Sequence, residues 1–328
     1  MTTLLSDAAP TAAAEAPQGR SPAALAWRRF RRDRVGIASG IVVALFFLVG
    51  LGAPVISWLY GKNPYTTYGQ NQPGLLNEYG YPIGPMGGMS SHFWLGVEPG
   101  LGRDVFTQLI YGIRTSLLIS LAIVLIVTVL GILAGVTAGY LGTWVDYSMS
   151  RAIDVVLCFP ATLFCIAFIP VVQSALVSPT QQVPTWLRAA TVILVLSAFG
   201  WASIARLLRG QVLSLREREF IQSAQVIGVP AHRIILRELL PNLWTPILIS
   251  VSLSVPAYVT TEAALSFLGA GMVEPTPDWG RMIQRGAEVY NADFSYMLFP
   301  GLAMLIFVLA FNLLGDSVRD ALDPKSGR

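Results

Sequence analysis

The stretch REREFIQSAQVIGVPAHRIILRELLPN (Arg216–Asn242) is polar and charged, although long apolar runs precede and follow it. Its first half has the spacing of a short amphipathic helix, and Gly228 is placed to end that helix in a left-handed cap. Pro230 prevents the helix from continuing, because its ring fixes the backbone and it has no N–H group. A second short helix is predicted at about Ala231–Leu240, before Pro241. Two turns of helix are marginally stable in water, so this segment is expected to be held by its own chain, by a partner protein, or by both.

The composition around this stretch is that of a membrane protein. Of the 328 residues, 54% are hydrophobic and only 12% are charged, and the mean hydropathy is +0.59. Soluble domains carry about 25% charged residues. Six apolar runs reach the roughly 20 residues that a helix needs to cross a bilayer, so an all-α membrane protein with six transmembrane helices is predicted. The runs are approximately Val35–Leu59, Leu117–Tyr140, Ile153–Val177, Ala189–Ala205, Leu243–Leu268 and Tyr296–Gly315.

The chain is predicted to have four parts. The first apolar run has about 25 residues, longer than the roughly 7–15 of a signal peptide, so it is interpreted as a retained anchor. The parts are a disordered tail (1–20), a basic segment with the first anchor (21–60), an extracytoplasmic loop (61–115), and a five-helix core (116–328) that contains the loop 216–242. Within the third part, one apolar helical face between Arg103 and Arg114 predicts an interfacial helix that leads into the second span.

The distribution of basic residues predicts the orientation of these spans. With six crossings and both termini in the cytoplasm, 16 of the 22 lysines and arginines lie on the inner side and 6 on the outer side. This bias agrees with the positive-inside rule, and it places Arg216–Asn242 in the cytoplasm. The basic residues are accounted for as topology signals, so the net charge of +3 requires no nucleic-acid partner.

The chemistry of an enzyme is missing from the sequence. The two histidines, His92 and His232, are predicted on opposite sides of the membrane, so they cannot share a catalytic or metal site. Cys158 and Cys165 fall on one predicted helix about 10 Å apart, too far for a disulfide, and are expected to be buried thiols. No Gly-x-x-x-x-Gly-Lys-Ser/Thr phosphate loop is present. We therefore expect no catalytic residues, metal or cofactor on this chain, and any ATP would be bound by another chain.

Small and polar residues within the spans suggest close packing and one unusual site. Gly131, Gly135 and Gly139 form a stripe that lets another helix approach closely. Glu262 lies at a depth where a carboxylate is costly unless it is paired or hydrated. It either faces a water-filled translocation path or makes an inter-helix hydrogen bond. Prolines that could kink the spans occur at Pro54, Pro160, Pro170, Pro246, Pro256 and Pro300.

The polar stretch resembles the cytoplasmic loop of ABC-importer permeases, whose motif reads Glu-Ala-Ala, three residues, Gly, nine residues, Ile-x-Leu-Pro. Here the motif falls on QSA at Gln222–Ala224, on Gly228, and on the ELLPN that contains Pro241. The spacing is kept, although Gln222 replaces the glutamate of the motif. In the family this loop forms a coupling helix that seats in a groove of the ATPase subunit. The resemblance implies that role for Phe220, Gln222, Ser223, Ala224, Gly228, Leu240 and Pro241.

Other stretches are similar to the C-type permeases of the dipeptide, oligopeptide and nickel importers. They are WRRFRRDRVGIASGIVV (Trp27–Val43), LGVEPGLGRDVFTQLIYGIRTSL (Leu95–Leu117), EAALSFLGAG (Glu262–Gly271), DWGRMI (Asp278–Ile283) and GDSVRDALDPK (Gly315–Lys325). Together they cover nearly the whole chain after Ser21. In the second of these stretches Val97 and Glu98 replace the Thr-Asp of the family pattern.

The resemblance implies a type I ABC importer permease fold and a multi-pass location in a bacterial or archaeal cell membrane. It implies ATP-driven, binding-protein-dependent import, with peptides as the expected substrate and dipeptides, oligopeptides, nickel and other solutes left open. The implied partners are a paralogous permease subunit, one or two ATPase subunits that bind the ATP, and an extracytoplasmic solute-binding protein. That binding protein would meet the outer loop and the segment near Trp279. Two alternatives stay open: a proton-coupled carrier or channel that uses Glu262, and a membrane scaffold without transport.

Overall fold

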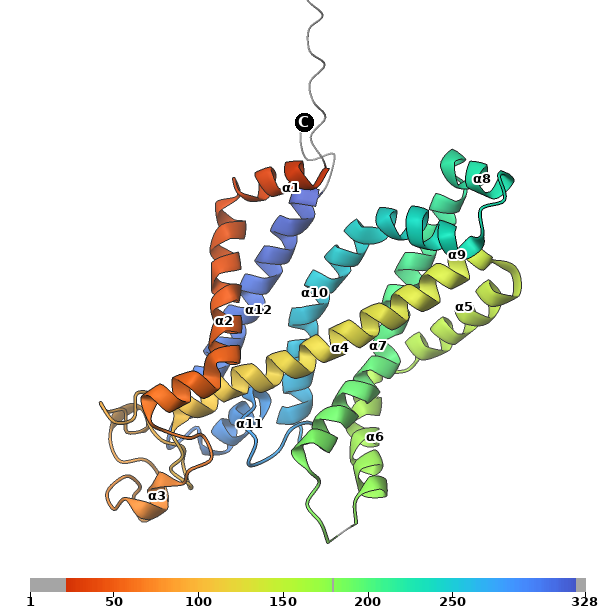
Figure 1. Cartoon of the computed structure of the whole chain (residues 1–328). Coiled ribbons are helices and arrows are strands. Elements are labelled where there is room, and N and C mark those ends of the chain that lie inside the picture. The colour runs from red at the N-terminus through yellow and green to blue at the C-terminus, as the bar shows by residue number, and fades with distance from the viewer. Residues whose placement is uncertain (1–21, 179, 323–328) are drawn as a thin grey trace, which may run out of the picture.

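The computed structural model describes residues 22–178 and 180–322, in which every regular element is a helix (Figure 1). The elements are α1 (Pro22–Phe30), α2 (Arg34–Tyr60), α3 (Tyr68–Asn71), the 3₁₀ turn η1 (Pro85–Gly87), α4 (Val105–Leu141), α5 (Thr143–Cys158), α6 (Ala161–Leu176), α7 (Thr185–Arg216), α8 (Glu219–Val226), α9 (Ala231–Ile234), the π-helical turn η2 (Ile235–Leu239), α10 (Leu240–Phe267), α11 (Trp279–Val289) and α12 (Ser295–Leu322).

Five continuous helices of the described chain are long and apolar enough to cross a membrane. They are α2, α4, α7, the continuous run from α9 to α10, and α12, and the bent pair α5–α6 supplies a sixth span. The predicted all-α architecture with six spans is therefore confirmed. Most of the predicted spans are shorter than the helices that contain them, because the helices continue into polar sequence at one or both ends.

The third predicted span, Ile153–Val177, is not one helix. It is divided between α5 and α6, which meet at an angle of 84°. The break lies at Phe159, whose extended backbone (φ −77°, ψ 136°) is the conformation that a residue before proline prefers. The prediction of two buried cysteines on one helix was wrong for the same reason. Cys158 ends α5 and is exposed, whereas Cys165 lies on α6 and is buried.

The second predicted span begins earlier than expected. No break separates an interfacial helix from the span, because α4 runs without interruption for 37 residues from Val105. Asp104 caps it, and its side chain accepts a hydrogen bond from the backbone N–H of Thr107 at 2.7 Å. The apolar face that suggested an interfacial helix is covered by protein: Ile110 and Ile113 are buried.

The glycine stripe of α4 packs against α7, as the sequence predicted for an unspecified helix. An added Cβ at Gly135 would lie 2.5 Å from the carbonyl oxygen of Ala205, and one at Gly139 would lie 2.8 Å from Val212 Cβ. No side chain larger than hydrogen fits between the two backbones at these positions. The α4–α7 pair therefore forms a close helix contact, and α7 leads directly into the polar segment.

We expect Gly135→Ala to destabilise the protein by about 1–3 kcal/mol, because the added methyl group forces the α4 and α7 backbones apart. Gly210→Ala is the matched control: Gly210 lies on the partner helix α7, at a position where no atom lies within 4 Å of the added Cβ. That change should be neutral or slightly stabilising, since alanine favours helix. The thermal unfolding midpoints of the detergent-solubilised variants measure both effects, and equal midpoints would contradict the close contact.

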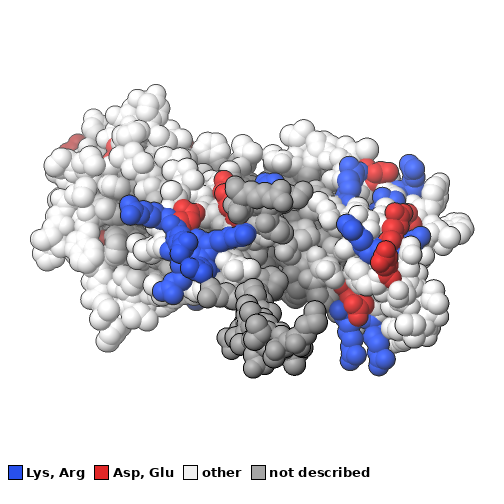
Figure 2. All heavy atoms as spheres, turned by 90° about the horizontal axis from the view of Figure 1, so that it is seen from above, with Lys and Arg blue, Asp and Glu red and all other residues white. Residues whose placement is uncertain are grey.

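Different helices lie at the two ends of the molecule. The helices α1, α8 and α9 lie at one end, with the end of α12, and α3, α11 and the α6–α7 connection lie at the other (Figure 1). Seen from the first end, the lysine and arginine side chains gather in two groups, one toward α1 and one toward α8 (Figure 2). Both ends of the described chain therefore lie on the same side of the bundle as the polar segment.

Candidate functional site

The polar segment folds as the sequence predicted up to Gly228. The helix α8 ends in a Schellman motif, in which the N–H of Val229 bonds to Ala224 O and the N–H of Gly228 bonds to Gln225 O. Gly228 has φ +84°, the left-handed conformation that this cap requires. Pro230 (φ −65°, ψ 144°) then starts the next helix.

The second half of the segment differs from the prediction of a separate short helix. From Ala231 to Phe267 the backbone is one continuous helix of 37 residues. Pro241, which has no N–H, lies in its interior, and the preceding turn (Ile235–Leu239) is π-helical, with the N–H of Leu240 bonded to Ile235 O. The chain that follows α8 is thus continuous with the fifth span, and no loop separates them.

Ile221 is the fully buried residue of α8, and several apolar residues near it face outward. Ile221 is fully buried in the main hydrophobic core, whereas Val226 is 89% exposed and Ile227 is 80% exposed. Phe220 is also exposed. A short helix that presents several large apolar side chains to solvent is typical of a protein-binding surface.

The seven residues that the resemblance assigned to coupling lie together on this segment but differ in exposure. Phe220, Gln222, Ser223, Gly228 and Pro241 are exposed. Ala224 and Leu240 are partly buried and pack against the core. The first five can contact another protein directly, while the last two hold the segment on the bundle.

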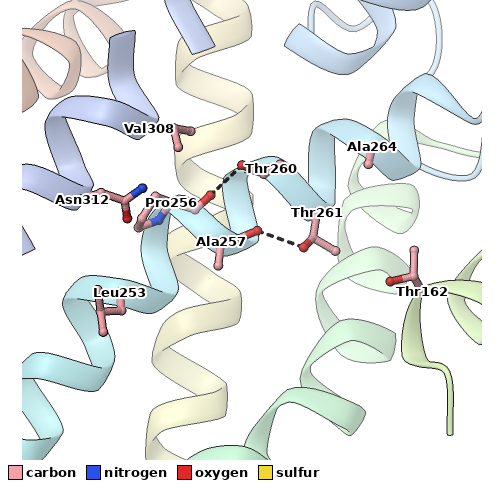
Figure 3. A pocket seen from close by; sticks show the side chains of 9 residues that line it. All are labelled: Thr162, Leu253, Pro256, Ala257, Thr260, Thr261, Ala264, Val308 and Asn312. Atoms are coloured by element: carbon pink, nitrogen blue, oxygen red, sulfur yellow. Dashed lines mark hydrogen bonds between the residues drawn. The ribbon is translucent and has the colours of Figure 1, made fainter. Parts of the chain in front are cut away.

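A groove of about 420 Å³ opens on the face shared by α6, α10 and α12 (Figure 3). Its lining is apolar except for threonines and one asparagine: Thr162, Leu253, Pro256, Ala257, Thr260, Thr261, Ala264, Val308 and Asn312. Thr260 and Thr261 donate hydrogen bonds of 2.9 Å to the carbonyl oxygens of Pro256 and Ala257. The threonines therefore satisfy their own polar groups and leave a mildly polar wall.

Glu262 does not line this groove. It is 0% exposed, and its Oε1 accepts a hydrogen bond from Ser266 on the same helix at 3.0 Å. Glu262 is thus enclosed by protein and lies off this groove, and its hydrogen bond to Ser266 stays within α10. The adjacent buried groups are Asp278 and Ser116, of which Ser116 Oγ donates to Asp278 Oδ2 at 3.0 Å.

A cluster of ionic and polar side chains, most of them buried, joins the outer loop to α4, α11 and α12, and we call it the outer ionic cluster. Its members are Glu98, Arg103, Gln108, Glu274, Arg281 and Tyr296. Arg103 Nη2 donates to Glu98 Oε1 at 2.8 Å, and Gln108 Nε2 donates to Glu98 Oε2 at 2.9 Å. Burial raises the pKa of Glu98, but the hydrogen bonds and charge of Arg103 more than offset this, so the pKa lies below its usual value.

Sequence reasoning missed this cluster, although the residues carry a signal. Glu98 and Arg103 lie in one of the family-like stretches, and Arg281 lies in another, DWGRMI. Trp279 of the same stretch is fully buried, and its ring packs at 5.9 Å from that of Phe307. The expectation that the segment near Trp279 meets a binding protein therefore cannot involve the tryptophan itself.

The fold, the polar segment and the groove are those expected of a permease subunit of binding-protein-dependent transport systems. Comparison with known proteins shows that the chain belongs to this family. The family described as "binding-protein-dependent transport system inner membrane component" matches residues 131–328. The N-terminal transmembrane domain of oligopeptide transport permease C matches residues 21–78. The chain is thus a multi-pass membrane protein of a transport family and not an enzyme.

Among named relatives, the chain is 33% identical to the dipeptide transport system permease protein DppC of Alkalihalophilus pseudofirmus, over 93% of this chain and 90% of that one. It is 34% identical to the glutathione transport system permease protein GsiD of Pectobacterium atrosepticum, over 93% and 92%. A chain of the MetNI methionine ABC transporter, solved in inward-facing conformations, matches the fold with a TM-score of 0.51 and 18% identity. That match covers 66% of this chain and 96% of that one.

Proposed function

We propose that this chain is the permease subunit of an ATP-driven importer of peptides. The exposed apolar surface of α8 carries the proposal, because a helix held by one buried residue, Ile221, presents Phe220, Val226 and Ile227 for a partner. The relatives named for dipeptide and glutathione transport support peptides as the substrate class.

In this proposal both termini and α8 lie in the cytoplasm of a bacterial or archaeal cell. The 16 to 6 distribution of basic residues supports this orientation. The common placement of α1, α8 and the end of α12 at one end of the bundle agrees with it (Figure 1).

ATP is bound by one or two partner ATPase subunits, and α8 seats in a groove of such a subunit. The coupling residues are Phe220, Gln222, Ser223, Ala224, Gly228, Leu240 and Pro241. When the ATPase subunits close, the displacement of α8 reaches the fifth span through the continuous helix that starts at Ala231. The equilibrium between inward-open and outward-open states shifts by the difference in ATPase affinity for the two states.

The face with the groove meets a paralogous permease subunit, so that the translocation path lies between two chains. The mildly polar wall of Thr260, Thr261 and Asn312 suits a solvated peptide better than lipid. At the opposite end from α8, the outer loop and the exposed residues of α11 receive a solute-binding protein.

The experiment that tests this function is purification followed by reconstitution. The tagged chain should bring down ATPase subunits and a second permease, and proteoliposomes with the complex should take up dipeptide when ATP and the binding protein are present. Uptake should persist with a proton uncoupler. Uptake that needs a proton gradient but no ATP would instead indicate a proton-coupled carrier.

A further inference from the structure

A second pocket of about 520 Å³ lies at the outer end of the bundle, between the start of α7 and the loop that follows α10. It shares no residue with the groove of Figure 3. Its wall on the α7 side contains Thr185 and Arg188, and its other wall contains Val273, Glu274 and Pro275. The size lies within the roughly 300–1,000 Å³ of small-ligand pockets.

Arg188 gives the α7 wall an uncompensated positive charge. Within the described chain, no carboxylate lies at ion-pair distance from its guanidinium, and its single hydrogen bond runs from Nη1 to Gln173 Oε1 at 3.3 Å. A guanidinium has five N–H donors in a fork that matches a carboxylate. Most of these donors are therefore available to a ligand.

Gln173 is the hydrogen-bond partner of Arg188 and does not itself line the pocket. Its side chain is on α6 and only 6% exposed, and Nε2 has no hydrogen-bond partner in the described structure. Its Oε1 is occupied by Arg188, so the free donor lies beside the guanidinium. No side chain caps the start of α7, whose positive helix end also favours an anion here.

The opposite wall carries the carboxylate of Glu274, which shares its charge with two arginines. Oε1 of Glu274 accepts both Arg103 Nη2 at 3.0 Å and Arg281 Nη1 at 2.8 Å. Among the described residues its Oε2 has no hydrogen-bond partner, and the side chain is 49% exposed. One half-open pocket thus offers cationic donors on one wall and a free carboxylate oxygen on the other.

We propose that this pocket binds the two charged ends of a free peptide, with Arg188 on the α-carboxylate and Glu274 facing the α-ammonium group. The inference deepens the proposed import of peptides and rests on it. An anionic phospholipid headgroup fits less well, because it offers no ammonium group to Glu274. The permease itself would then select free peptides over peptides with a blocked C-terminus as they leave the binding protein.

The first test compares dialanine with dialanine amide as substrates of the complete complex in proteoliposomes. Arg188→Gln should reduce dialanine uptake about tenfold and leave amide uptake unchanged, and Arg188→Lys should keep part of the preference. The same binding protein is used throughout, so a change in preference belongs to this chain. An equal loss for both substrates, or no loss, would overturn the proposal.

The second test needs no transport. Gln182, an exposed residue of the pocket, is replaced by cysteine in a Cys158→Ser background and labelled from outside with a membrane-impermeant maleimide. Dialanine should slow labelling, dialanine amide should not, and Arg188→Gln should remove the protection. Equal protection by inorganic phosphate, or protection that depends on anionic lipid in the vesicles, would exclude a peptide-specific site.

The two tests separate the failure of the site from the failure of the function. If dialanine protects Gln182→Cys but the wild-type complex shows no ATP-dependent uptake of dialanine, the proposed peptide import is wrong and the proposed binding site is retained. If the wild-type complex takes up dialanine normally but dialanine does not protect Gln182→Cys, the proposed binding site is wrong and the proposed peptide import is retained.

Discussion

Replacing Val226 and Ile227 together with aspartate is expected to abolish ATP-driven uptake and leave the membrane bundle folded. Both side chains are more than three-quarters exposed, at 89% and 80%, so the change removes no core packing. Loss of an interface anchor typically costs about 2 kcal/mol or more, and two buried carboxylates would add a further penalty. We therefore expect the affinity for the ATPase subunits to fall at least about 30-fold.

The measurement is co-purification of the ATPase subunits together with uptake in proteoliposomes. The matched control replaces the same two residues with leucine, which keeps the surface apolar and should preserve both readouts. Thermal stability of the isolated chain should match the wild type in both variants. Retained ATPase binding in the aspartate variant would show that α8 is not the docking element.

Replacing Glu98 with alanine is expected to lower the free energy of unfolding by about 3–5 kcal/mol, because it leaves the buried charges of Arg103 and Arg281 partly uncompensated. Glu98 is 1% exposed and holds Arg103, Gln108 and Tyr296 at once. Denaturant unfolding of the purified protein measures the effect. Glu288→Ala is the control: its carboxylate is 52% exposed and, among the described residues, forms an ion pair with Arg285 alone, so about 0–1 kcal/mol is expected.

The pH dependence of the stability of Glu98→Gln distinguishes the contribution of the Glu98 charge from that of its side-chain packing. The folded protein lowers the pKa of Glu98, so its charged form stabilises the fold fully above the ordinary glutamate value of about 4.3. That contribution is lost as the pH falls from there through the lowered folded pKa. The stability gap between wild type and Glu98→Gln should therefore shrink in acid, and a constant gap would indicate a loss of packing alone.

Features set by local chemistry were predictable from the sequence. The hydrophobic runs located the spans, and the left-handed Gly228 cap followed from one glycine beside a proline. The break at Phe159 was harder. Six prolines occur within the apolar runs, and the one that breaks a span, Pro160, has no local signal that distinguishes it from Pro54, Pro170, Pro246, Pro256 and Pro300, which lie inside helices.

The long-range features could not be read from local pattern. The outer ionic cluster joins Glu98 to Tyr296, which are 198 positions apart, so only the folded chain brings them together. The surroundings of Glu262 could not be predicted for another reason. Its depth in the span follows from hydropathy, but a span that is apolar on all sides does not reveal which face a single carboxylate occupies.

The two faces of α10 restrict how the fifth span can move. On one face of α10 the side chain of Glu262 is buried by surrounding protein, and the opposite face lines the groove of Figure 3. Rotation of α10 about its long axis would move the Glu262 carboxylate toward lipid or into the open groove. Exposing the carboxylate there would cost several kcal/mol of free energy. Tilting α10 about its outer end would keep the carboxylate enclosed. Displacement of α8 should therefore open and close the translocation path by tilting α10 about its outer end.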